Sequence, residues 1–413
     1  MSDAAPATLD APLSKSPLWT RDFRLYFTAR TVSMFGDAMM HTALTMGLLE
    51  AGYGPAGVGF ALAAWTASVA VLILFGGVLA DKFTARRMMI GADAARFLLQ
   101  GLMAVLFLVG TPPFWQILVI MALSGAATAM FQPGVGSTVP QVASDVQRAN
   151  ATLKVAESLM VLIGPAVAGP LVAVAGAGVV FGLDAATFAV SGLCLLLLRL
   201  RPLADVVPEG SMLRNLREGW REFRSRTWLW SVIVIWTFMG ICVFGPMLPL
   251  GATVIRDAHG AAMYGVVMSA YGAGTILGGL VGMRLRPRRT LLAGGCAMLL
   301  YPLGILMIAT AAPLGMLIAA EVLAGAGWAF WSVMWATSIQ TNIPGPVLNR
   351  ITAYEVSGSI MSVPVGQAIA GPAMLLFGGP HQVLFVSVAV SFASCVALFS
   401  VPAIRRLRRG PAS

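Results

Sequence analysis

Long apolar segments follow one another along almost the whole chain. A helix needs about 20 mostly apolar residues to cross the hydrocarbon core of a membrane. Segments of that kind, bounded by charges, prolines or glycine clusters, lie at residues 24–50, 56–80, 87–110, 114–141, 149–176, 178–199, 228–253, 261–284, 290–311, 314–341, 348–378 and 381–403. Only 11% of the 413 residues are charged, whereas a soluble domain carries about 25%. The sequence therefore predicts an all-α membrane protein with twelve transmembrane helices.

Basic residues lie in alternate connections between these segments. They are Lys15, Arg21 and Arg24, then Lys82, Arg86 and Arg87, then Arg148, then several in 199–226 and 284–289, then Arg350, then several in 405–409. The intervening connections hold only Arg256. Because Lys and Arg concentrate on the cytoplasmic side of membrane proteins, both termini are predicted to be cytoplasmic, with tails at 1–23 and 404–413. Residues 1–17 lack the apolar core of a signal peptide.

Two pairs of segments repeat half a chain apart. FGGVLADKFTARR at Phe75–Arg87 aligns without a gap to LGGLVGMRLRPRR at Leu277–Arg289, an offset of 277 − 75 = 202 residues. GPAVAGP at Gly164–Pro170 and GQAIAGP at Gly366–Pro372 show the same offset. We expect two six-helix halves in the same orientation, at 24–199 and 228–403. Residues 200–227 between them are predicted to form a cytoplasmic linker with a basic amphipathic helix on the membrane surface.

Composition also argues against several classes of protein. The net charge of +10 comes from residues at the ends of apolar segments, which argues against nucleic-acid binding. Each of the four cysteines stands alone in an apolar segment and the three histidines are far apart, so neither a disulfide nor a metal site is predicted. The chain has no GxxxxGK[ST] loop and no grouping of a nucleophile, a base and oxyanion donors. We therefore expect no cofactor, no ATP hydrolysis and no enzymatic activity.

Local motifs resemble those of major facilitator superfamily transporters. The turn with Gly77, Asp81, Lys82, Arg86 and Arg87 is similar to the family signature between helices two and three. Further phrases resemble drug–proton antiporters that include macrolide and siderophore (enterobactin) exporters: Asp93-Ala-Ala-Arg96, Phe131-Gln-Pro133, Arg148-Ala-Asn150, Gly164-Pro165 with Gly169, and Leu183-Asp184-Ala-Ala-Thr187-Phe188. The resemblance covers the whole chain and implies the major facilitator fold.

The resemblance also implies roles for two of these motifs. Asp81 is expected to face the start of helix eleven near 348–350, where a helix dipole favours a carboxylate, and so to latch the halves together on the cytoplasmic side. The alternative is that Lys82, Arg86 and Arg87 only obey the positive-inside rule. Gly164, Pro165 and Gly169 resemble the antiporter motif of exporters, and the alternative for them is ordinary packing of small residues.

The chain departs from the family pattern at two places. Thr84 and Ala85 stand where the family turn has Gly and Arg, and segment 114–141 lacks the arginine that many drug–proton antiporters carry in helix four. Arg96 is a candidate substitute for that arginine. The mechanism of proton coupling therefore stays open at the level of sequence.

Ionisable residues inside the apolar segments are candidates for proton coupling. Asp37 lies midway along the first segment, with His41 one turn later and Arg30 two turns earlier on the same face. A carboxylate near the bilayer centre must face a cavity or a partner, or carry a proton. Asp37 is the first candidate, and the alternative is a fixed ion pair with Arg30 or Arg96. The full set of coupling candidates is Asp37, His41, Arg96, Glu321 and Glu355.

Other charged residues in the segments are read as structural. Asp93 with Arg96 and Lys154 with Glu157 have i,i+3 spacing, which favours charge neutralisation within the bundle over proton transfer. Asp184, near the outer end of the sixth segment, is also read as structural.

Aromatic and methionine side chains are candidates for a substrate cavity. Trp328, Trp331 and Trp335 recur on one face of the tenth segment, which suits a large amphipathic ligand, although packing between helices explains each of them equally well. The cavity candidates are Phe35, Met39, Trp65, Phe131, Trp236, Tyr271, Trp328 and Trp331.

Taken together, these features predict a monomeric secondary transporter of the bacterial inner membrane that exports an amphipathic small molecule in exchange for protons. Its expected partners are that small molecule, protons and membrane lipids. Proton-linked uptake of a nutrient is the alternative within the class. A receptor or scaffold that kept the fold without turnover is the alternative from another class, and a channel fits a two-fold repeat poorly.

Overall fold

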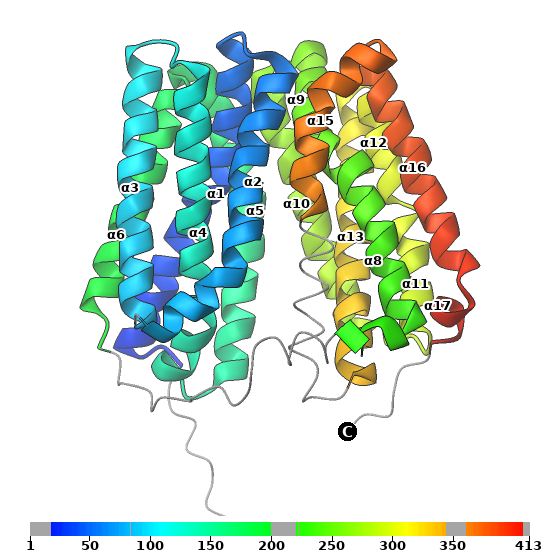
Figure 1. The fold of residues 1–413 in the computed structure, drawn as a ribbon, viewed down its shortest axis with the longest axis horizontal. Coiled ribbons are helices and arrows are strands. Elements are labelled where there is room, and N and C mark those ends of the chain that lie inside the picture. The colour runs from blue at the N-terminus through cyan, green and yellow to red at the C-terminus, as the bar shows by residue number, and fades with distance from the viewer. Residues whose placement is uncertain (1–17, 83, 200–219, 222, 344–360, 408–413) are drawn as a thin grey trace, which may run out of the picture.

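The computed structural model describes residues 18–82, 84–199, 220–221, 223–343 and 361–407, and within them every regular element is helical. The first half holds α1 (Arg21–Glu50), α2 (Gly54–Lys82), α3 (Ala85–Val109), α4 (Phe114–Val142), α5 (Val146–Ala175) and α6 (Ala177–Leu197) (Figure 1). These helices run antiparallel to their neighbours in sequence, as short turns between membrane helices require.

The second half follows the same plan with more interruptions. One span is built from α8 (Thr227–Met239), a π-helical turn η1 (Gly240–Phe244) and α9 (Gly245–His259), and another from α11 (Thr290–Met298) and α12 (Tyr301–Ala309). The remaining helices are α10 (Ala261–Arg284), α13 (Leu314–Asn342), α15 (Ser362–Phe377), α16 (Pro380–Ser400) and the short α17 (Pro402–Arg406).

The predicted fold class is confirmed, because helix occupies every predicted span as far as the structure describes it. Ten spans in the described residues are long and apolar enough to cross a membrane. The first span, α1, is less apolar because polar residues such as Asp37, His41 and Thr42 interrupt it. The eleventh is described only from Met361 onward, where α15 is a shorter apolar helix. Most of the predicted linker lies outside the described residues.

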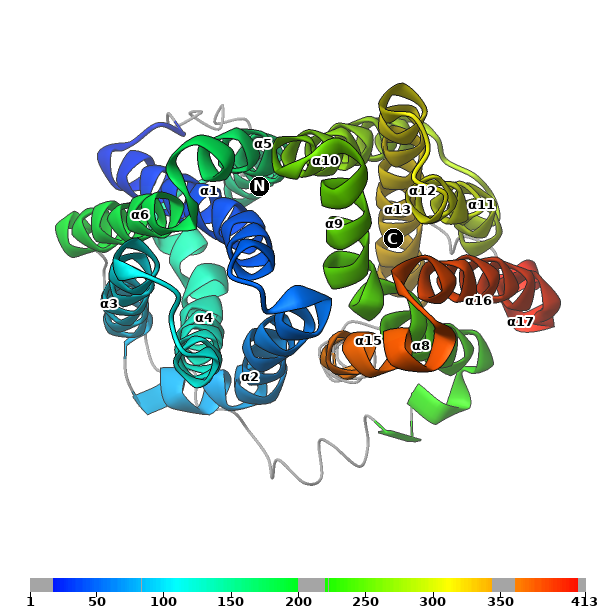
Figure 2. The same ribbon diagram turned by 90° about the horizontal axis from the view of Figure 1, so that it is seen from above.

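Seen from above, the two halves lie side by side as two helical groups (Figure 2). They contact each other mainly through α5 against α10 and α2 against α15. We call the end of the bundle where α1 begins and α17 ends the basic face, since Arg21, Arg86, Arg148 and Arg405 lie there (Figure 1). The other end, with the α1–α2 and α9–α10 turns, is the opposite face.

The repeated glycine segments make equivalent contacts in the two halves. A Cβ atom on Gly164 of α5 would lie 2.5 Å from the Cβ of Ala38 on α1. Its counterpart Gly366 on α15 abuts the carbonyl oxygen of Gly240, and 240 − 38 = 202 residues separate the two contacted positions. The sequence repeat therefore preserves a close helix crossing within each half, which only a residue without a side chain permits.

Glycines also close the contact between the halves. A Cβ on Gly169 of α5 would lie 3.0 Å from the Cα of Gly265 on α10, and Gly265 itself abuts the carbonyl of Pro165. On the other side of the bundle, Gly371 of α15 abuts Ala56 of α2. All of these residues lie in the helix portions toward the opposite face, so the halves are packed backbone to backbone there.

Arg86, at the start of α3, binds the end of α6. Its Nε donates to the carbonyl oxygen of Leu195 at 2.9 Å, and its Nη2 donates to that of Leu196. Arg21 adds a longer bond to Leu197. The last carbonyls of a helix have no partner within the helix, so Arg86 caps α6 in addition to standing on the basic face.

Replacing Arg86 with Ala is therefore expected to lower the free energy of unfolding by about 1–2 kcal/mol, since two charge-assisted hydrogen bonds are lost. The neighbouring Arg87 is exposed and is the matched control. Thermal unfolding of the purified variants in detergent measures both. Equal stability of Arg86→Ala and Arg87→Ala would show that the contacts with α6 contribute nothing.

Candidate functional site

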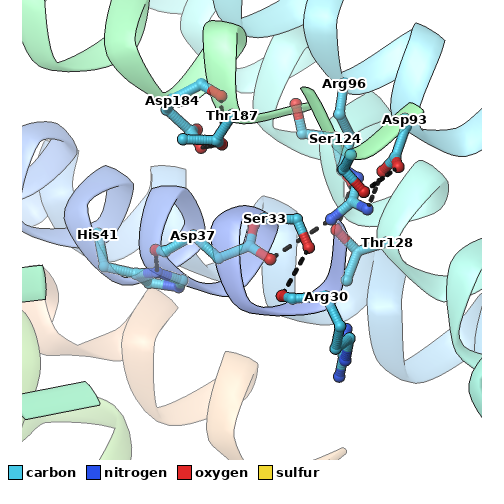
Figure 3. Close-up of polar contacts among 11 residues, drawn as sticks. Arg30, Ser33, Asp37, His41, Asp93, Arg96, Ser124, Thr128, Asp184 and Thr187 are labelled. Atoms are coloured by element: carbon cyan, nitrogen blue, oxygen red, sulfur yellow. Dashed lines mark hydrogen bonds and ion pairs between the residues drawn. The ribbon is translucent and has the colours of Figure 1, made fainter. Parts of the chain in front are cut away.

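A buried arginine joins three helices in the first half. Arg96 on α3 is 2% exposed; its Nη2 donates to Asp93 Oδ1 at 2.6 Å and its Nη1 to Asp37 Oδ2 on α1 at 3.4 Å (Figure 3). The other oxygen of Asp93 accepts a 2.6 Å hydrogen bond from Ser191 on α6. We call Asp37, Asp93, Arg96, Asp184, Thr187 and Ser191 the Arg96 cluster.

Two aromatic rings hold the guanidinium of Arg96 in place. Its central carbon lies 4.7 Å from the ring centre of Phe131 and 4.2 Å from that of Phe188. Cations are attracted to aromatic faces, more strongly where water is excluded. Phe131 is buried, so in this structure it supports Arg96 and does not reach an open surface. Arg30 approaches the same ring at 5.6 Å.

The carboxylates that bind Arg96 differ in access to solvent. Asp37 has 27% of its side chain exposed, whereas Asp93 has none. Of the two partners that the sequence left open for Asp37, the ion pair in the structure is with Arg96. The arrangement thus offers one carboxylate that can exchange a proton while the other keeps the guanidinium fixed.

His41 lies one turn from Asp37 but does not contact its carboxylate. Its Nδ1 is 2.9 Å from the carbonyl oxygen of Asp37, and its ring meets Trp65 edge to face at 4.9 Å. These contacts leave its role in coupling a prediction.

Asp184 belongs to the same cluster although sequence reasoning gave it no functional role. Its side chain is wholly buried on α6 and lies directly against Gly36, the residue that precedes Asp37. The signal was present in the sequence, since Asp184, Thr187 and Ser191 are spaced i, i+3 and i+7 and so form a polar stripe along one face of a helix.

The second half contains a buried acid of its own. Glu321 on α13 is 3% exposed, and its Oε1 lies against Gly304 of α12 with no hydrogen-bond partner among the described residues. Tyr264, Tyr271 and Tyr301 lie within electrostatic range of this carboxyl group. Glu355, the other candidate of this half, lies outside the described residues.

Tryptophans stack through the core of the second half. Trp331 is 2% exposed and lies parallel to Trp236 at 4.6 Å and to Trp335 at 6.1 Å. Trp328 is half-buried and meets Phe244 edge to face at 5.2 Å. The predicted cavity residues therefore fall into two groups. Four of them are packed in the interior: Met39, Phe131, Trp236 and Trp331. The other four keep partial exposure: Phe35, Trp65, Tyr271 and Trp328.

The predicted latch is only partly visible. Gly77, Asp81 and Lys82 lie in α2, but their side chains and residues 348–350 fall outside what the structure describes. On the second half, Gly278 packs against Ala326 of α13, whereas a Cβ added to Gly279, the counterpart of Gly77, would meet no atom within 4 Å among the described residues. Lys154 and Glu157 form the expected ion pair at 3.0 Å.

Comparison with known proteins gives a consistent result. A sequence model of the Major Facilitator Superfamily matches residues 26–363. An uncharacterized MFS-type transporter, YvqJ of Bacillus subtilis, is 23% identical over 376 residues, covering 89% of either chain. Macrolide efflux protein A of Streptococcus pyogenes is 21% identical over 408 residues, covering 95% of this chain and 98% of its own.

Solved structures share the fold. The nucleoside transporter NupG superimposes with a TM-score of 0.78 at 12% identity, over 92% of this chain and 99% of that one. A bacterial homologue of the human lysosomal transporter Spinster, in an inward-facing and occupied conformation, gives a TM-score of 0.72 at 13% identity, over 97% of this chain and 100% of its own.

Proposed function

We propose that this chain, a multi-pass membrane transporter that belongs to the Major Facilitator Superfamily, exports an amphipathic small molecule in exchange for protons. The observation that carries the proposal is the pair between partly exposed Asp37 and buried Arg96. A carboxylate in a membrane interior is costly unless it is paired or protonated. Asp37 therefore has two stable conditions, bound to Arg96 as an anion or neutral with a proton.

These two conditions couple a proton to the arrangement of the helices. A proton on Asp37 cancels its charge and weakens the 3.4 Å contact between α1 and α3, while Asp93 keeps Arg96 in place. A ligand shifts a conformational equilibrium only through its different affinity for the two states. The proton binds best in the state where Asp37 is released from Arg96. Proton binding therefore favours that arrangement of the helices, and that arrangement in turn favours proton binding.

The substrate path is proposed to lie between the halves. Its wall would include the partly exposed aromatic residues Phe35, Trp65, Tyr271 and Trp328, with Trp236 behind them. Similarity to Macrolide efflux protein A supports a bulky amphipathic substrate and export over uptake. Bacterial relatives support the inner membrane as the location.

The basic residues support a cytoplasmic position for the basic face and both termini. In that orientation the opposite face, where the halves are packed together, is the outer one, and we propose that the conformation described is inward-facing. Asp81 is proposed to latch the basic face in the outward-facing state, and Gly164, Pro165 and Gly169 to serve as the antiporter motif. Uptake in the other direction and a receptor without turnover remain the competing functions.

An efflux panel in a bacterial host that lacks its own drug pumps tests the proposal. Cells that produce the chain should accumulate less of a macrolide such as erythromycin, and Asp37→Asn should reduce this efflux about tenfold or more because the residue can no longer exchange charge. Asp257→Asn removes an exposed acid near the opposite face and should export like the wild type. Wild-type efflux by Asp37→Asn at equal membrane abundance would reject Asp37 as the coupling group.

A further inference from the structure

We infer that Asp184 is a neutral, proton-bearing carboxyl group in this conformation and forms the buried end of a proton path that begins at Asp37. The inference deepens the proposed function, on which its role in coupling rests. The sequence alone suggested only a structural role for Asp184, as part of a motif that resembles the family.

Two buried acids of the Arg96 cluster differ in their hydrogen bonds. Asp93 and Asp184 are both fully buried. Each oxygen of Asp93 has a donor, Arg96 on one side and Ser191 on the other. Asp184 has only the Thr187 hydroxyl at 3.5 Å from Oδ1, and that hydroxyl also donates to the backbone oxygen of Asp184 at 2.6 Å. Its Oδ2 is buried with no partner among the described residues.

The charged groups closest to Asp184 are paired with other residues. The helices packed against α6 are α1, α3 and α5. On α3 the cation Arg96 is already bound by Asp93 and by Asp37 of α1.

Four further charged or titratable groups of α1 and α5 have contacts of their own. His41 and Arg30 of α1 contact the Asp37 backbone and the Phe131 ring. Lys154 and Glu157 of α5 pair with each other on an exposed side. A charged Asp184 would add a second buried anion near the Asp37 carboxylate, and a buried charge without a partner of its own is costly. The neutral acid avoids that cost.

Asp184 lies beside the part of α1 that carries Asp37. Its carboxyl group lies against Gly36, where a side chain would collide with it. Figure 3 shows Asp184 over the stretch of α1 that carries Asp37. Gly36 therefore lets the acid of α6 reach the part of α1 that carries the exposed acid. The Nε of Arg96 has no hydrogen-bond partner among the described residues, so the guanidinium can still donate one more hydrogen bond.

The proton transfer balances within the cluster. The O–H bond at Asp184 breaks, a new O–H bond forms at the Asp37 carboxylate, and Asp184 becomes the anion. Arg96, released by neutral Asp37, supplies the compensating positive charge to Asp184. The net charge of the cluster changes only when Asp37 exchanges its proton with water on the open side.

Infrared spectroscopy of the full-length protein in lipid nanodiscs tests the protonation directly and without a substrate. At neutral pH the wild type should show the carbonyl band of a carboxylic acid, which shifts in heavy water. Asp184→Asn should lose that band or a resolved component of it, while Asp93→Asn should keep it. Glu321→Gln identifies any component from the buried acid of the second half. Thr187→Val, which removes the hydroxyl that bonds to Asp184 Oδ1, should shift the band without abolishing it.

Absence of the band in the wild type at neutral pH, or an unchanged band in Asp184→Asn, would overturn the inference. These spectra do not depend on whether the chain transports anything. Coupling is then tested in liposomes with erythromycin as the probe. Asp184→Asn should lose about tenfold of the pH-driven transport, whereas Asp257→Asn, which changes an exposed acid outside the Arg96 cluster, should keep it. Full coupling in that variant would overturn the path, whereas absent transport by the wild type would instead reject the proposed function.

Discussion

Replacing Arg96 with Gln is expected to lower the free energy of unfolding by about 3–5 kcal/mol, because breaking a buried ion pair leaves an uncompensated charge. Asp93 would lose its 2.6 Å partner while remaining wholly buried. The faces of Phe131 and Phe188 would lose the cation that lies between them. Thermal and denaturant unfolding of the purified variant in detergent measures the loss.

A second variant separates this charge effect from simple loss of packing. The pair Asp93→Asn with Arg96→Gln leaves no buried charge at this position and should recover most of the stability. Arg256→Gln, which breaks an exposed ion pair with Asp257, should cost about 0.5 kcal/mol or less. Equal stability of Arg96→Gln and Arg256→Gln would mean that the Arg96 cluster does not hold α1, α3 and α6 together.

Replacing Gly265 with Leu is expected to abolish transport, with a fall of about tenfold or more, because the new side chain cannot fit in the closed state. A Cβ added to Gly265 on α10 would collide with the carbonyl oxygen of Pro165 and would lie 3.0 Å from the Cα of Gly169 on α5. Backbone atoms cannot move aside without separation of the two helices. The variant should therefore spend most of its time with the opposite face open.

Spin labels or fluorophores placed on α5 and α10 near the opposite face measure that separation, and substrate efflux measures its consequence. Gly279 lies on the same helix, and a Cβ added there would meet no atom of the described residues within 4 Å, so Gly279→Leu is the matched control. A Gly265→Leu protein with the wild-type spacing and wild-type efflux would show that closure of this face is not part of the transport cycle.

The helices themselves were predictable because the length of each apolar segment shows whether it can span a membrane. The interruptions were not. The span predicted at 228–253 runs on to His259 and contains the π-helical turn Gly240–Phe244. That turn faces Gly366 of α15, and a contact between helices far apart in sequence leaves no local pattern.

Part of the candidate site could also be predicted. The position of Asp37 in mid-membrane marked it as exceptional, and Arg96 was one of its two expected partners. The bond between Asp93 and Ser191 and the contact of Asp184 with Gly36 depend on how α6 is rotated against α1 and α3. Rotation is set by packing, so the sequence showed the polar stripe on α6 but not what it faces.

The tryptophans of α13 illustrate the same limit. Their common face was predicted from their spacing, but the stacking of Trp331 on Trp236 depends on the approach of α8. A single chain does not distinguish an aromatic side chain that binds substrate from one that packs. In the structure Trp328 keeps partial exposure while its neighbour Trp331 is buried, which is why Trp328 is the proposed substrate contact of the two.

Proton-coupled transport through Asp37 is tested most directly with purified protein in liposomes that carry an imposed pH gradient. A macrolide such as erythromycin is placed inside or outside, and macrolide flux and internal pH are followed together in the wild type and in Asp37→Asn. We expect the wild type to move the macrolide and protons in opposite directions, with the flux following the pH gradient, and Asp37→Asn to show neither movement. Macrolide flux that ignores the pH gradient, or equal proton movement in both proteins, would contradict coupling through Asp37.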